Sequence, residues 1–211
     1  MVDDLFDVAL LQRMADEFYP PDAPQWYRFS NDKEEKLVIS NSEQDLPPTI
    51  KHFVRTLNAE PFLLQLSALT GIHGLIPDPY LIGAGMHCIP RGGKLEIHAD
   101  FNVHPLMQVA RRLNILIYLN YDWQEAYGGS LELWDRSMRH CVTRIAPLFN
   151  RMVILLTDDF SFHGHPTLLT CPADWTRKSI AMYYYTADRP ASELREPVAH
   201  DTLFQERPTS E

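Results

Sequence analysis

Two residues with metal-binding side chains, His98 and Asp100, are separated by a single residue. In an extended strand alternate side chains project from the same face, so this imidazole and this carboxylate can bind one metal ion from one side. A third ligand has to come from elsewhere in the chain, and His163 and His165 are the candidates. Two imidazoles and one carboxylate on one face leave three positions of an octahedral ion open, an arrangement suited to Fe(II).

A histidine and an aspartate two apart also occur by chance, as a surface pair on a strand, so companion residues matter. Arg177 lies 14 residues after His163, where the apolar segment 179–183 begins. An oxygenase that uses 2-oxoglutarate needs a cation for the far carboxylate of that molecule, and a guanidinium can bind a carboxylate in a bidentate manner. Taken alone, Arg177 could equally be a surface charge beside Lys178.

Composition limits the class of protein. The chain has 211 residues, which is enough for one domain, and its net charge of −9 argues against non-specific binding to nucleic acid or to an anionic membrane. Its cysteines, Cys88, Cys141 and Cys171, are too few and too far apart for a disulfide framework or a zinc-thiolate site. Residues 1–11 are not typical of a signal peptide, and no apolar run approaches 18 residues. We therefore expect a cytoplasmic protein with free thiols.

The pattern of apolar and turn residues predicts a mainly β fold with helices at the N-terminus. Helices are expected at 4–18, 48–57 and 61–69. Between the first two helices, the polar stretch 30–45 is expected to be exposed. Short segments rich in branched or aromatic residues predict strands at 80–89, 94–98, 113–119, 130–134, 141–146, 151–156 and 179–185. The connections are too short for a crossover helix between each pair, which favours a sandwich or jelly roll.

We accordingly expect a single domain over residues 1–211. Residues 1–75 would form a helical N-terminal support, residues 80–186 the jelly-roll core, and residues 187–211 a surface tail.

Five segments together resemble a known family. HADFN, RRLNILIYLNYDW, YGGSLELWD, SFHGHP and TRKSIAMYYYT follow one another as in the Fe(II)/2-oxoglutarate oxygenases related to prolyl hydroxylases, including stand-alone bacterial members. The resemblance covers about residues 80–186. It implies a double-stranded β-helix, a variant of the jelly roll, flanked by N-terminal helices.

The resemblance also implies roles for individual residues. His98, Asp100 and His163 would bind iron, which favours His163 over His165 as the third ligand. Further positions correspond to residues that hold or surround 2-oxoglutarate, namely Arg177, Tyr118, Leu116, Leu131 and Tyr183. Related halogenases have a small residue in place of Asp100, so its presence implies hydroxylation.

The substrate side differs from that of the relatives. Cys88 stands where many have a tyrosine, and His165 where some have a valine, so prolyl specificity does not follow. Arg111 is expected to face the pocket and Arg112 the solvent, while Asn102 follows the metal ligands directly. Arg111, Asn102, His165 and Cys88 are thus the candidate substrate contacts.

The sequence therefore predicts a dioxygenase that uses Fe(II), O2 and 2-oxoglutarate, with ascorbate as a candidate reductant. It would hydroxylate an unactivated C–H bond of an amino acid, peptide or small metabolite and release succinate and CO2. Two alternatives remain. One is a hydroxylase of prolyl or other residues in proteins, and the other is a non-catalytic, cupin-like binding protein, which would have no need for Arg177 and Tyr118 at their positions.

Overall fold

Antiparallel strands rich in branched and aromatic residues form a single curled sheet in the computed structural model, which describes residues 1–194 and 198–208. One side of the curl has the strand order β1 (Val2–Asp3), β10 (Arg151–Leu156), β7 (Ala110–Tyr118), β12 (Thr176–Thr186) and β5 (Gly85–Pro90). The longest strands, β7 and β12, are almost entirely buried, because side chains pack on both of their faces.

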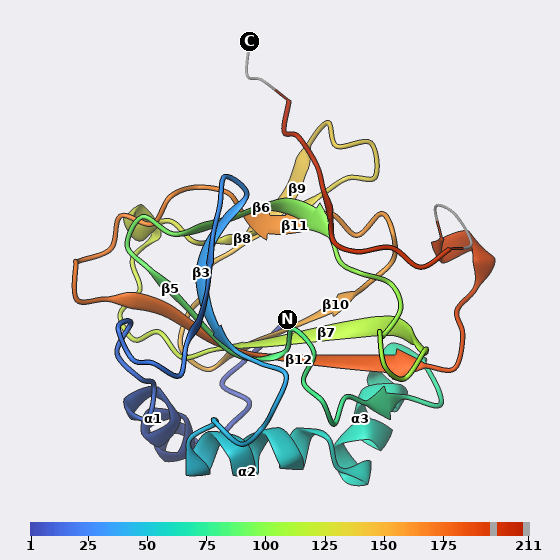
Figure 1. The fold of residues 1–211 in the computed structure, drawn as a ribbon, viewed down its shortest axis with the longest axis horizontal. Coiled ribbons are helices and arrows are strands. Elements are labelled where there is room, and N and C mark those ends of the chain that lie inside the picture. The colour runs from blue at the N-terminus through green and yellow to red at the C-terminus, as the bar shows by residue number, and fades with distance from the viewer. Residues whose placement is uncertain (195–197, 209–211) are drawn as a thin grey trace.

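The other side of the curl continues the same sheet. After β5 follow β3 (Glu34–Ile39), β6 (Lys94–Ala99), β11 (His163–His165), β8 (Leu131–Trp134) and β9 (Cys141–Ile145). Strand β3 pairs with both β5 and β6 and so joins the two layers, which face each other across a central space (Figure 1). This architecture is the predicted jelly roll.

Several short elements complete the fold. Strand β2 (Tyr27–Ser30) forms a hairpin with β3, β4 (Ile76–Pro77) pairs with β12, and β13 (Leu203–Phe204) pairs with β6. Two single turns of 3₁₀ helix lie at Glu125–Tyr127 and Ala191–Glu193.

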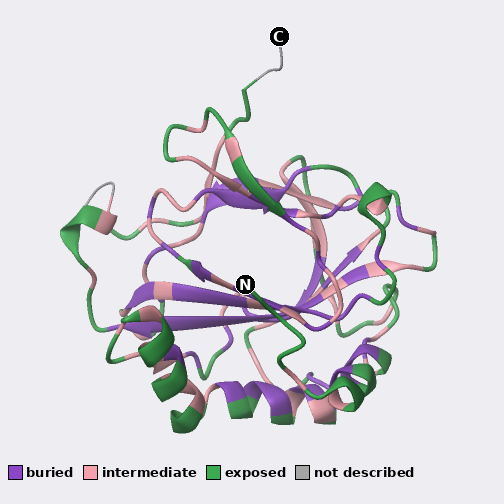
Figure 2. Cartoon of the chain, turned by 180° about the vertical axis from the view of Figure 1, so that it is seen from behind, coloured by how far each residue is buried: buried purple, intermediate pink, exposed green. Residues whose placement is uncertain are grey.

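Three helices cover the outer face of the β7–β12–β5 layer (Figure 1), and these are α1 (Val8–Asp16), α2 (Pro48–Leu57) and α3 (Glu60–Thr70). Their ends follow local chemistry, since the Asp7 carboxylate accepts a hydrogen bond from the Leu10 amide at the start of α1. At the end of α3, Gly71 adopts the left-handed conformation with a φ of 71°. Exposed residues lie on the outer side of the helices, and the strands above them are buried (Figure 2).

The predicted helix 48–57 is confirmed with the same bounds, and the predicted core strands are confirmed to within a few residues, except that the first begins at Gly85. The prediction of an exposed polar stretch is wrong for residues 34–39. Leu37 and Ile39 are buried under the helices, and the polar side chains of β3 point into the curl. The first 75 residues therefore supply strands as well as helices.

The C-terminal tail also differs from the expectation of a surface extension. Leu203 and Phe204 pair with Ala99 and His98, and the Gln205 amide donates to the carbonyl of Ile97. The tail thus adds a short strand at the edge of β6, directly beside the predicted metal ligands. Among the described residues, no helix has the length and apolar character that crossing a lipid bilayer requires.

The packing of α2 on the sheet can be tested with two substitutions to alanine that remove side chains of the same size. Ile50 is fully buried, whereas Leu64 on α3 is 62% exposed. Ile50→Ala should lower the free energy of unfolding by about 2–5 kcal/mol, because it leaves a cavity between helix and sheet. Leu64→Ala should cost less than about 0.5 kcal/mol. Urea denaturation measures both, and similar losses would contradict this packing.

Candidate active site

The three predicted metal ligands converge at one end of the curl. His163 opens β11 and is the cross-strand partner of His98 on β6, and Asp100 follows β6 directly. One donor atom from each residue lies within 4.8 Å of the others. The Nε2 atoms of His98 and His163 are 3.6 and 3.5 Å from the Asp100 carboxylate oxygens, and the two rings are 4.6 Å apart.

Hydrogen bonds on the far side of each imidazole orient it toward this point. The Nδ1 of His98 donates to the carbonyl of Glu96 at 2.8 Å, and the Nδ1 of His163 donates to the carbonyl of Ser161 at 2.8 Å. Because a carbonyl can only accept, each Nδ1 carries the proton and each Nε2 keeps its lone pair. Burial lowers the pKa of His163 to about 4, so its imidazole is neutral near pH 7. Both rings therefore turn their Nε2 atoms toward the point where the three side chains converge.

Asp100 is held by two side chains from β7. The Asn114 amide donates to Oδ2 at 2.7 Å, and the Arg111 guanidinium lies 3.3 Å from the same oxygen. Arg111 also donates to Asn114 and stacks between the rings of Tyr183, 3.5 Å away, and Phe101, 4.4 Å away. Burial alone would raise the pKa of Asp100, but Arg111 and the two imidazoles hold it well below its usual value. The carboxylate is therefore ionised and fixed.

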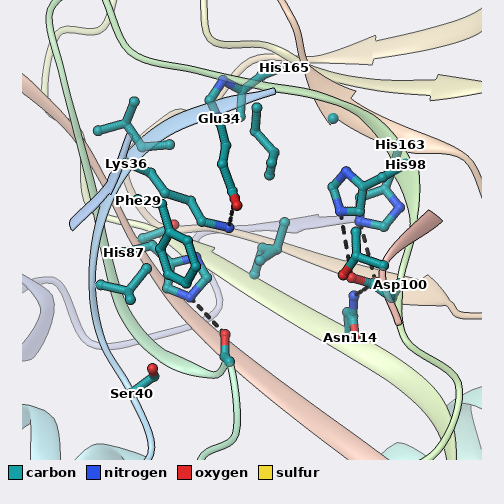
Figure 3. Close-up of a pocket in the computed structure, with 18 of the residues that line it drawn as sticks. Phe29, Glu34, Lys36, Ser40, His87, His98, Asp100, Asn114, His163 and His165 are labelled. Atoms are coloured by element: carbon teal, nitrogen blue, oxygen red, sulfur yellow. Dashed lines mark hydrogen bonds and ion pairs between the residues drawn. The ribbon is translucent and has the colours of Figure 1, made fainter. Parts of the chain in front are cut away.

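These residues line a cavity of about 260 Å³ inside the curl. The triad lies on one side of it, with Lys36, Phe29 and His87 across from the triad (Figure 3). The predicted site residues that line the cavity are His98, Asp100, His163, Arg177, Leu116, Leu131, Tyr183, Arg111 and His165.

Arg177, at the start of β12, is a buried cation. Its side chain donates from Nε to the carbonyl of Gly129 at 2.7 Å and from Nη2 to the hydroxyl of Tyr118 at 3.2 Å. Burial lowers the pKa of Arg177, and among the described residues it has no carboxylate partner. Since an unpaired buried charge is costly, this guanidinium calls for an anion from a bound molecule. Tyr118 itself is fully buried behind Arg177 and is not part of the cavity wall.

Gly129 makes room for that guanidinium. It has a φ of +74°, and a Cβ there would lie 2.9 Å from Cδ of Arg177 and 2.7 Å from Cδ2 of Leu169. The absence of a side chain at Gly129 therefore permits the close approach of Arg177 to the backbone.

Two predicted substrate contacts lie outside the cavity wall. Cys88 is 1% exposed and belongs to the hydrophobic core on the helix side of β5, whereas its neighbour His87 lines the cavity. Strand alternation thus places the cavity residue one position earlier than expected. Asn102 holds the tail, since it donates to the carbonyl of Val198 and accepts from the amide of His200.

Arg111 faces the cavity as expected, but Arg112 does not point freely into solvent. Its side chain is 12% exposed and bonds to Thr186 and Glu193. His104 is fully buried, pairs with Asp78 at 3.1 Å and does not line the cavity.

Sequence reasoning missed the cavity residues of the hairpin and the tail, namely Phe29, Glu34, Lys36, Val38, Ser40, Thr202 and Phe204. The alternation of cavity-facing and core-facing side chains in β3 is the sequence signal that could have identified the hairpin residues. Glu34 and Lys36 face the cavity and form an ion pair of 2.7 Å, while Leu37 between Lys36 and Val38 faces the core. The tail strand is too short to carry such a signal.

Comparison with known proteins agrees with the geometry of the core. The sequence model of the 2OG-Fe(II) oxygenase superfamily matches residues 84–185, which contain the triad, Tyr118 and Arg177. The match spans just under half of the chain, and this part is similar to the superfamily. Together with the triad, it indicates a 2-oxoglutarate-dependent, non-haem iron dioxygenase. No curated protein matches the sequence of this oxygenase.

Solved structures share the fold of this oxygenase at low sequence identity. A prolyl-4-hydroxylase from Pseudomonas putida is 16% identical with a TM-score of 0.62, over 88% of this chain and 90% of the other. A Trichoplax adhaerens prolyl hydroxylase, in complex with a hypoxia inducible factor peptide fragment, is 17% identical with a TM-score of 0.58, over 87% and 81%. HygX from Streptomyces hygroscopicus, with nickel, 2-oxoglutarate and hygromycin B bound, is 12% identical with a TM-score of 0.56, over 95% and 92%.

The residues of this oxygenase fit both groups that its superfamily requires. Two imidazoles and one ionised carboxylate form the donor set that Fe(II) takes on one face. Arg177, with no carboxylate partner in the described chain, fits the far carboxylate of 2-oxoglutarate.

The support of Asp100 by Asn114 yields a prediction. Asn114→Ala should weaken Mn(II) or Fe(II) binding roughly 10- to 100-fold, because the carboxylate loses the hydrogen bond that orients it. Ser179→Ala removes another buried polar group of the cavity wall that has no contact with the triad, and it should bind metal like the wild type. Anaerobic metal titration measures this, and equal affinities for all three proteins would refute the supporting role.

Proposed function

We propose that this oxygenase hydroxylates an unactivated C–H bond of a small molecule or peptide. One atom of O2 would enter the substrate as a hydroxyl group, and the other would enter succinate as 2-oxoglutarate loses CO2. The observation that carries the proposal is the presence, in one cavity, of the iron-type triad and of a buried guanidinium without a carboxylate partner in the described chain.

Iron and 2-oxoglutarate, when bound, would supply the oxidising chemistry with O2. The chain itself positions and shields them. His98, Asp100 and His163 hold the metal from one face and leave its other face to ligands. Arg177, oriented by the hydroxyl of Tyr118 behind it, holds the far carboxylate of the cosubstrate, while Leu116 and Leu131 provide apolar walls that exclude water. Because Asp100 occupies a ligand position, the proposed outcome is hydroxylation.

The substrate side is formed by segments outside the matched residues 84–185. Strand β3 contributes Glu34, Lys36 and Ser40 to the cavity, and the tail contributes Thr202 and Phe204. The Phe204 ring lies 5.6 Å from that of His98, so the tail borders the metal site. Charged and hydroxyl groups on this wall favour a polar substrate. Structural neighbours were solved with a peptide fragment and with hygromycin B, which is consistent with either substrate type.

The cupin-like alternative is disfavoured by Arg177. A protein that only binds a metal has no use for a buried guanidinium without a counter-ion, because its burial costs free energy. Succinate formation from 2-oxoglutarate that depends on added Fe(II) distinguishes the two functions. A screen of amino acids, peptides and small polar metabolites for stimulation of succinate release would then define the substrate class.

Replacement of the carboxylate ligand tests the triad. Asp100→Ala should abolish succinate formation and weaken Fe(II) binding, because a single-face site with only two imidazoles is left. Asp22→Ala, at an exposed position, serves as a control and should retain full activity. A fully active Asp100→Ala enzyme would refute the assignment.

Replacement of the buried cation tests the cosubstrate site. Arg177→Gln should raise the 2-oxoglutarate concentration needed for half-maximal succinate release about 10- to 100-fold, because a charge-assisted hydrogen bond is lost. Arg136→Gln, whose side chain is 64% exposed in the wild type, should behave like the wild type. An unchanged requirement in the Arg177 variant would mean that the carboxylate is held elsewhere.

A further inference from the structure

His165 is a buried side chain without a hydrogen-bond partner. It is 3% exposed, and neither ring nitrogen has a partner or reaches solvent. The other histidines of the cavity differ from it. His98 and His163 donate to backbone carbonyls, and the Nε2 of His87 bonds to the carbonyl of Gly83. A buried polar group without a partner destabilises the fold, so its retention points to a partner supplied by a bound molecule.

The position of His165 indicates which bound molecule could supply the missing hydrogen-bond partner. His165 lies two residues after His163, and both line the cavity. Its cross-strand partner on β6 is Leu95, whose partner on β3 is Glu34, and Figure 3 shows His165 on the Glu34 side of the cavity, away from the triad. The apolar cavity residues Leu116 and Leu131 offer it no hydrogen bond.

Charge in this part of the cavity favours an anion. Arg177 and Lys36 line the same cavity as His165. The register of β11 on β8 sets Gly164 opposite Glu132, three residues after Gly129, whose carbonyl accepts a hydrogen bond from Nε of Arg177. Lys36 is already paired with Glu34, whereas Arg177 has no carboxylate partner in the described part of the chain. An anion bound by Arg177 would therefore lie within the electrostatic neighbourhood of His165.

We propose that His165 is a specificity residue for the cosubstrate, and that its ring N–H donates a hydrogen bond to the far carboxylate of 2-oxoglutarate held by Arg177. This inference rests on the proposed function. The chain would then bind that carboxylate through two side chains, Arg177 and His165, while the hydroxyl of Tyr118 orients the guanidinium of Arg177. It would consequently select a five-carbon 2-oxo dicarboxylate over 2-oxo acids that lack the second carboxylate.

Binding measured by calorimetry without oxygen tests this, with the full chain loaded with Fe(II). The probes are 2-oxoglutarate and 2-oxovalerate, which has the same keto-acid end but no second carboxylate. His165→Leu should weaken 2-oxoglutarate binding about tenfold or more, since one hydrogen bond to a charged group is lost. It should leave 2-oxovalerate binding unchanged. His165→Gln, which keeps a donor, should restore part of the affinity for 2-oxoglutarate.

The control is His52→Leu, which replaces an exposed histidine of α2 outside the cavity, and it should not weaken 2-oxoglutarate binding. Equal affinity of wild type and His165→Leu for 2-oxoglutarate would overturn the proposal. An equal loss for both probes would also overturn it, because the effect would then lie at the metal end or in the fold.

The proposed function and the role of His165 can be refuted separately. If the wild type binds 2-oxoglutarate and Arg177→Gln does not, the proposed function stands whatever the His165 variants show. If the wild type binds no 2-oxoglutarate in the presence of Fe(II), both the proposed function and the role of His165 are refuted.

Discussion

The antiparallel pairing of β11 with β6 is the contact on which the site depends. It sets His163 opposite His98, although the two are far apart in sequence, and brings their rings to 4.6 Å. Strand β11 has only three residues and is held on its other side by β8. Gly164 allows the close approach, because a Cβ there would lie 2.7 and 2.8 Å from the carbonyl oxygens of Glu96 and Leu95. The register shift beside it keeps His165 on the cavity wall as well.

Two buried guanidiniums give the cavity its electrostatic character, and they differ in one respect. Arg111 has its counter-ion within the chain, Asp100, and is further held by Asn114 and two aromatic rings. Arg177 is held only by a carbonyl and the Tyr118 hydroxyl within the described residues. Because the cost of a buried charge has to be offset by a partner, the first arginine serves the metal ligand and the second serves a bound anion. This difference between Arg111 and Arg177 follows from contacts within the chain alone.

The sequence predicted the parts of the site whose signals are local. Alternation in a strand placed His98 and Asp100 on one face, and long apolar segments marked β7, β10 and β12. The third ligand could be narrowed only by resemblance, because the pairing of β11 with β6 is a long-range contact. Cys88 was expected in the cavity, but the face of a strand inverts with a shift of one residue, and the structure places His87 there instead.

The missed elements have a physical explanation as well. Strand β3 begins with Glu34, Glu35 and Lys36, whose charges suggest solvent, yet Glu34 and Lys36 neutralise each other inside the curl. The two-residue strand in the tail forms because the edge of β6 is open to pairing, which the tail sequence does not reveal. Both elements lie outside residues 84–185, so what is individual to this oxygenase is also what was hardest to predict.

The most direct test of the central claim is a crystal structure of the protein with Mn(II) and 2-oxoglutarate, grown without oxygen. The account predicts one ion bonded to Nε2 of His98, Nε2 of His163 and the carboxylate of Asp100. The keto-acid end of 2-oxoglutarate should lie on that ion, and its far carboxylate on Arg177. An ion bound by other residues, or a 2-oxoglutarate molecule whose far carboxylate lies away from Arg177, would contradict it.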